Sequence, residues 1–123
     1  MSISNYAENK LLDAIGGTAF SVTNAYLQLH TGDPGEDGTA NVASNTTRKA
    51  VSFSSAAGGS MDSSATVEWT NVSNTETYSH WSMWDSLDGT GSNNHLWYGA
   101  LASSASVVAG DTFQITLLTL TLD

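Results

Sequence analysis

The hydrophobic period of the sequence changes once, near residue 17, and this change constrains the fold more than any other feature. Residues 4–15 carry apolar side chains at helical spacing, and Gly16 and Gly17 then end the pattern. Beyond them apolar and polar residues alternate in short runs, at residues 25–30, 65–70 and 118–122. No second segment of helical length lies between these runs, so a parallel sheet with crossover helices is disfavoured. We expect an antiparallel all-β body preceded by one short helix.

The N-terminal segment has the signals of a helix start. Asn5 is the expected N-cap, and Glu8, three residues on, completes a capping box. The apolar positions share one face of this helix: Ala7, Leu11, Ala14 and Ile15, with Tyr6 near its edge. A helix this short, with one apolar face, is predicted to lie on a larger body.

The remaining chain has weaker strand patterns at residues 50–54, 79–84, 96–102 and 112–117, which brings the expected number of strands to about seven or eight. Clusters of Gly, Asp, Asn and Pro separate them at residues 32–38, 57–60, 88–94 and 109–111. This pattern is typical of a β-sandwich or jelly roll. The polar residues 39–47 are expected to form a long flexible loop. We predict a single domain over residues 1–123, with the helix and its cap in residues 1–17 and the strands and loops in residues 18–123.

Charge and cysteine content exclude several classes of function. Charged residues make up 12% of the 123 residues, and the formal net charge is -9. Such a chain repels nucleic-acid phosphates and anionic lipid headgroups, so we expect neither nucleic acid nor a membrane as a partner. The chain contains no cysteine, which excludes disulfides, thiolate metal sites and a cysteine nucleophile. The first residues lack a basic leader pattern, so we expect synthesis in the cytoplasm without secretion.

The sequence gives little support for catalysis or metal binding. His30, His80 and His95 lie on three separate segments without a metal-ligand spacing. Many serines are present, but none has a Gly-x-Ser-x-Gly setting, so we expect no enzyme activity and no cofactor. Two acidic regions contain oxygen ligands that calcium prefers: Asp33, Glu36 and Asp37 in one, and Asp85, Asp88, Asn93 and Asn94 in the other. Neither matches a defined calcium loop, and turns need the same residue types, so calcium binding stays open.

Two groups of side chains allow both a structural and a functional interpretation. Trp84 and Trp97 belong to an aromatic cluster that can form a core or subunit interface, or a stacking platform for a sugar ring. Arg48 and Lys49 supply two of the three basic charges of the chain. This pair can form a salt bridge to the acidic loop around Asp33, or it can contact an acidic surface on a partner.

Several segments of the chain together resemble a known family. Residues 5–13, the run Leu-His-Thr-Gly-Asp-Pro-Gly at residues 29–35, and residues 48–53, 80–85, 96–101 and 109–113 follow one another in the order seen in small tailed-bacteriophage virion proteins. Members are described as capsid cement (decoration) proteins or, more loosely, as tail-fibre or minor tail proteins. The resemblance covers nearly the whole chain. It implies a β-sandwich of jelly-roll type that assembles on the outside of the particle, which cement proteins often do as trimers, and it implies no catalytic residue.

The resemblance leads to two functional hypotheses. The first is a capsid cement protein that binds the major capsid protein between capsomers on the outer capsid surface and stabilises the head as a homo-oligomer, typically a trimer. Its candidate contact residues are Tyr6, Leu11, Leu12, His30, Asp33, Pro34, Arg48 and Lys49. The alternative is a tail-fibre or tail-tip module that binds host-surface glycans by stacking them on Trp84 and Trp97.

Overall fold

The computed structural model describes residues 1–122 and consists mainly of short antiparallel strands. It contains one α-helix, α1 (Asn5–Ile15), and one 3-10 turn, η1 (Ser92–Asn94). The strands within the described residues are β1 (Ser2–Ile3), β2 (Ala25–His30), β3 (Lys49–Val51), β4 (Ser60–Asp62), β5 (Val67–Trp69), β6 (Glu76–Trp84), β7 (His95–Val107), β8 (Phe113–Ile115) and β9 (Thr119–Thr121). The antiparallel, mostly β structure with one short helix confirms this coarser part of the fold expected from the sequence.

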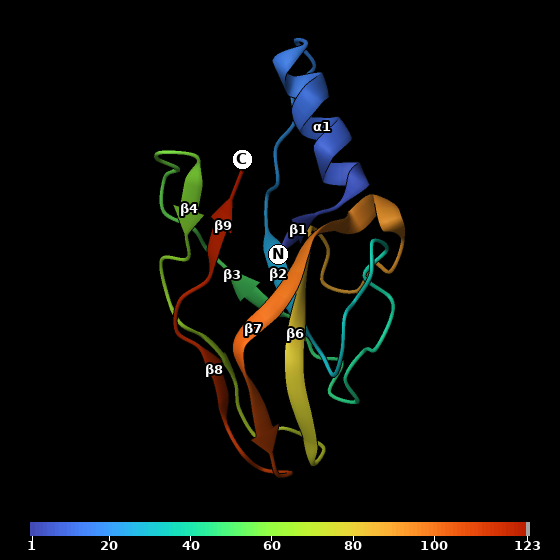
Figure 1. Ribbon diagram of the computed structural model, residues 1–123, viewed down its shortest axis with the longest axis vertical. Coiled ribbons are helices and arrows are strands. Elements are labelled where there is room, and N and C mark those ends of the chain that lie inside the picture. The colour runs from blue at the N-terminus through green and yellow to red at the C-terminus, as the bar shows by residue number, and fades with distance from the viewer. Residues whose placement is uncertain (123) are drawn as a thin grey trace.

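Strands β6 and β7 form the long central pair of the molecule (Figure 1). They belong to a five-stranded sheet with the order β1-β7-β6-β2-β3, in which every pairing is antiparallel. Two smaller antiparallel sheets pair β4 with β9 and β5 with β8. The β6–β7 register shifts after Tyr78 and again between Met83 and Trp84, and such irregularities bend a strand and increase its twist.

The core lies between the five-stranded sheet and the two small sheets. The large sheet contributes buried side chains that include Leu27, Leu29, Tyr78, Trp81, Met83 and Trp97, and the small sheets and their connections contribute Val67, Trp69, Ile115, Leu118 and Leu120. Phe113 joins the two groups, because its ring centroid lies 5.2 Å from that of Tyr78 and 5.8 Å from that of Trp69. Removing these aromatic surfaces from water is the main force that holds the two layers together.

Most predicted strands are present, although their lengths differ. The pattern at residues 25–30 matches β2, whereas β6 and β7 extend well beyond the predicted residues 79–84 and 96–102. Strands β1 and β4 give no recognisable pattern in the sequence, because runs of two and three residues are too short to show alternation. The expected turn at residues 57–60 does form, and it leads directly into β4.

The prediction of a flexible loop at residues 39–47 is wrong in one respect. The segment is long and contains only an isolated bridge between Val42 and His30, but it is fixed to the body of the protein. The carboxylate of Glu76 accepts hydrogen bonds from the backbone N–H groups of Ser44, at 2.9 Å, and Asn45, at 3.0 Å. Ala43, which directly precedes Ser44, is buried in the core. Backbone groups tied down in this way do not sample many conformations.

The helix differs from the prediction in its cap and in its packing. Ser4, not Asn5, is the N-cap, and its side chain accepts a hydrogen bond from the N–H of Ala7. Ala7 is the buried residue of the helix, whereas Ile15 is 85% exposed. The face of α1 that carries Ala7 and Leu11 therefore lies toward the body, and the C-terminal end of the helix projects from one end of the molecule (Figure 1). No helix within residues 1–122 has the length and apolar character needed to cross a membrane.

Candidate functional site

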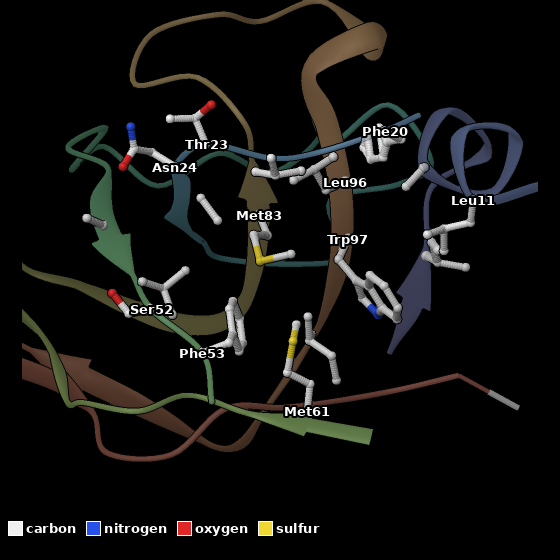
Figure 2. A pocket seen from close by; sticks show the side chains of 17 residues that line it. Leu11, Phe20, Thr23, Asn24, Ser52, Phe53, Met61, Met83, Leu96 and Trp97 are labelled. Atoms are coloured by element: carbon white, nitrogen blue, oxygen red, sulfur yellow. The ribbon is translucent and has the colours of Figure 1, made fainter. Parts of the chain in front are cut away.

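An apolar groove lies beside the base of the projecting helix. Its volume is about 510 Å³, and it is bounded by α1, the segment that follows the helix, β3, β4 and β9. Figure 2 shows the side chains that point into it, among them Leu11, Phe20, Phe53, Met61, Met83, Leu96 and Trp97. Apolar surface that is left open in this way is typical of a contact site for another molecule.

One polar atom in the groove has no partner within the described residues. The indole Nε1 of Trp97 is buried and makes no hydrogen bond in the part of the chain that the structure describes. Buried N–H groups are nearly always satisfied, because leaving one unpaired costs free energy. The groove therefore presents a large apolar surface, and the wall formed by Trp97 contains one unpaired buried N–H group.

A second cleft, of about 460 Å³, has a different chemical character. It lies between residues 38–46 on one side and residues 87–90 on the other, and Gln28, Arg48 and Trp84 also line it. The Nε of Arg48 donates a hydrogen bond to Oε1 of Gln28 at 2.9 Å, and Nη1 donates to the backbone carbonyl of Ser86 at 2.8 Å. These bonds hold the guanidinium in one position at the cleft.

The expected salt bridge between Arg48 and the acidic loop does not form. Arg48 is 7% exposed, and both of its hydrogen-bond partners are neutral oxygens. Burial lowers the pKa of Arg48 from its ordinary value, and the charge of Asp88 partly offsets this effect. The carboxylate of Asp33 instead accepts a hydrogen bond from the N–H of Gly35, and that of Glu36 accepts one from the N–H of Asn5.

His30 and His95 are buried and make hydrogen bonds within the fold. His30 is fully buried: its Nδ1–H donates to the Ala40 carbonyl at 2.8 Å, which leaves Nε2 to accept from the Ser82 hydroxyl at 2.7 Å. Ser82 in turn accepts a hydrogen bond from the Trp84 indole at 2.7 Å. His95 donates from Nδ1 to the Glu36 carbonyl at 2.8 Å.

Burial lowers the pKa of both buried histidines. Between residues 1 and 122, no three His, Asp or Glu side chains gather in a way that could hold a metal ion. Of the two acidic regions considered for calcium, Asp85 accepts a hydrogen bond from the side chain of Asn94 at 2.8 Å, so this carboxylate serves the loop in which it lies.

The structure separates the candidate contact residues into two groups. His30, Pro34 and Arg48 are buried and do not lie on the outer surface, although Arg48 lines the second cleft. Leu12 and Asp33 are exposed, and Tyr6, Leu11 and Lys49 are partly exposed. Of these, Tyr6, Leu11 and Leu12 lie together on α1, and Leu11 reaches the groove.

The proposed sugar platform on Trp84 and Trp97 is wrong in this conformation. Trp84 is 1% exposed and Trp97 is 8% exposed, whereas stacking on a sugar requires an open ring face. Both rings instead belong to the protein interior, which the sequence left open as the other interpretation. The polar lining of the cleft was not predicted. Gln28 gave no signal of it, because a polar residue at this position fits the alternation of residues 25–30.

A family model matches nearly the whole chain. The sequence model of the family Gp80, described as podophage GP4 fiber I protein gp80, matches residues 2–123. The matched region includes α1, the groove and the cleft. No curated protein matches the chain.

Proposed function

The chain belongs to the Gp80 family, whose description is podophage GP4 fiber I protein gp80, and from this membership we propose that it is a structural subunit of a virion fibre. The family makes it a phage protein of the virion. The observation that carries the structural role is the family match over residues 2–123. The open apolar groove beside the projecting helix supports the same role, because fibres are built by contacts between subunits.

The family description favours a fibre over capsid cement. A cement protein would sit between capsomers on the outer capsid surface and bind the major capsid protein, whereas the family is named for a fibre. Our proposed location is therefore the fibre. The jelly-roll arrangement also belongs to this proposal, and the two layers of antiparallel strands are consistent with it.

A second copy of the chain is our proposed occupant of the groove. The projecting end of α1 carries Leu12, which is 65% exposed, and Ile15, and the same helix borders the groove through Leu11. Each copy therefore has an apolar helix end and an apolar groove. Two or three copies can cover both if the helix end of one copy lies in the groove of the next. A trimer is the arrangement that the resemblance to phage virion proteins favours.

Localisation in the virus particle tests the fibre proposal. Cryo-electron microscopy of intact virions should show the density of this chain in an appendage outside the head. Densitometry of purified particles should then give a few to a few dozen copies per particle, depending on the number of fibres. Density repeated between capsomers over the capsid lattice, with hundreds of copies, would overturn the fibre and support the cement role with the major capsid protein as partner.

A further inference from the structure

Arg48 is a buried positive charge whose hydrogen bonds go only to neutral oxygens. The bonds to Gln28 and Ser86 use Nε and Nη1, and neither uses the second amino group, Nη2. Burying a charge is costly unless an opposite charge compensates it, and a guanidinium is best matched by a carboxylate that accepts two parallel hydrogen bonds. In residues 1–122 the carboxylate that acts on Arg48 is Asp88, through its charge and not through a hydrogen bond.

The surroundings of Arg48 match a small, hydroxylated acid. The cleft has a volume of about 460 Å³, enough for one or two sugar rings, and the hydroxyl-bearing residues Thr39, Thr46 and Thr90 line it. Its apolar residues, Val42 and Leu87, can cover the carbon faces of a ring. The Trp84 ring is covered by Arg48, so a ligand meets the guanidinium and not the indole.

We propose that this cleft binds a carboxylate-bearing sugar, such as a uronic acid, through the guanidinium of Arg48. The inference rests on the proposed fibre function, because acidic sugars are components of the cell surfaces that fibres meet. Asp88 at the same cleft restricts the charge of the ligand. One cation opposed by a nearby carboxylate accommodates a singly charged acid and disfavours a doubly charged phosphate.

Binding to a single cleft is expected to be weak. The net charge of -9 repels an acidic polymer at long range, although salt screens this repulsion beyond about 8 Å at physiological ionic strength. Several copies in one fibre would raise the overall affinity for a polymer that repeats the same acid.

Titration with small probes, followed by NMR of the full chain, tests the proposal. Sodium glucuronate should shift the Arg48 Nε–H signal, and glucose, which lacks the carboxylate, should not. Acetate carries the carboxylate without the ring, and it should bind at least tenfold more weakly than glucuronate. Equal binding of acetate would overturn the sugar assignment and favour a carboxylate on a protein partner. No shift with any of the three probes would overturn the site itself.

Three variants separate the role of Arg48 from an effect on folding. Arg48→Gln should abolish glucuronate binding, and Lys49→Gln is the matched control because Lys49 is the adjacent basic residue and does not line the cleft. Asp88→Asn removes the opposing charge and should strengthen binding severalfold, a result that does not depend on Arg48→Gln remaining folded. Unchanged binding in Asp88→Asn, or retained binding in a folded Arg48→Gln, would contradict the proposal. These outcomes are independent of where the protein lies in the virion.

Discussion

The guanidinium carbon of Arg48 lies 4.1 Å from the centroid of the Trp84 indole. The His95 ring also packs on this indole, with 4.8 Å between centroids. Arg48 directly precedes β3, and Trp84 is the last residue of β6, so this contact joins the two strands. The guanidinium also covers an aromatic ring that would otherwise face the cleft. A contact of this kind contributes both packing and electrostatic attraction.

Replacing Arg48 should therefore destabilise the fold as well as abolish the proposed ligand binding in the cleft. Arg48→Met leaves Oε1 of Gln28 and the Ser86 carbonyl without their donor, and we expect the free energy of unfolding to fall by about 1–3 kcal/mol. Urea denaturation measures the change. Lys49→Met should alter the same quantity by less than about 0.5 kcal/mol, because this side chain is only partly buried. Equal effects of the two substitutions would contradict the role given to Arg48.

Gly38 tests how closely the loop approaches the Trp84 and His95 rings. Its φ is +71°, and a Cβ at this position would lie 2.7 Å from Cδ2 of His95 and 2.8 Å from Cζ2 of Trp84. Gly35 has a similar φ of +74° but open space around it. Gly35→Ala should cost about 1 kcal/mol from backbone strain alone, and Gly38→Ala should cost roughly 1–3 kcal/mol more. Thermal unfolding of the two variants gives the difference, and similar melting temperatures would show that the loop can move away.

Substitutions at Ser4 and Asn5 distinguish the observed N-cap of α1 from the predicted one. The Ser4 hydroxyl accepts from the Ala7 N–H at 3.1 Å and donates to the His95 carbonyl at 2.5 Å. Ser4→Ala should therefore lower the free energy of unfolding by about 1–2 kcal/mol. Asn5→Ala should change it by less than about 0.5 kcal/mol, since Asn5 lies inside the helix and is exposed. The opposite order in a denaturation experiment would restore Asn5 as the cap.

The buried histidines should make stability depend on pH. Desolvation lowers the pKa of His30 and His95 in the folded state below the ordinary value of about 6.5. The unfolded chain then binds more protons than the folded chain below this pH, so stability is fully present above about pH 6.5 and falls as the pH drops toward 5. The slope should reach at most about 1.4 kcal/mol per pH unit for each histidine.

Urea unfolding at several pH values between 7 and 5 measures this slope. His30→Gln should reduce it, because the variant removes one of the two buried imidazoles. If His30→Gln left the slope of unfolding free energy against pH unchanged, His30 would not be a source of the pH dependence.

The exposed end of α1 should govern self-association. The double substitution Leu12→Lys and Ile15→Lys is expected to convert the proposed oligomer to a monomer and to change the free energy of unfolding by less than about 0.5 kcal/mol, because both side chains already face water and positive charges suit the C-terminal end of a helix. Light scattering after size-exclusion chromatography measures the mass. Substitutions are preferable to deletion of residues 1–15, which would also remove β1 from the edge of β7. An oligomer that persists in the double variant would contradict helix exchange.

The sequence alone determined the features that depend on local spacing. The alternation at residues 25–30 predicted β2, and the pair of glycines at residues 16 and 17 predicted the end of α1, because a strand period and a helix stop can be read from adjacent residues. The absence of a second helical segment was enough to predict an antiparallel β fold. The resemblance of dispersed segments placed the chain among phage virion proteins, which the family match confirms.

Only the tertiary structure decided which of these residues are accessible. Trp84 and Arg48 are 36 positions apart in the chain, and nothing in their local sequence shows that one covers the other. Burial depends on which strands become neighbours. In the large sheet β2 lies between β3 and β6 and pairs with both. That arrangement hid the tryptophans, turned an expected salt bridge into bonds with neutral oxygens, and left Leu12 and Ile15 in water. Local spacing specifies secondary structure, whereas exposure is a property of contacts between segments that are distant in the sequence.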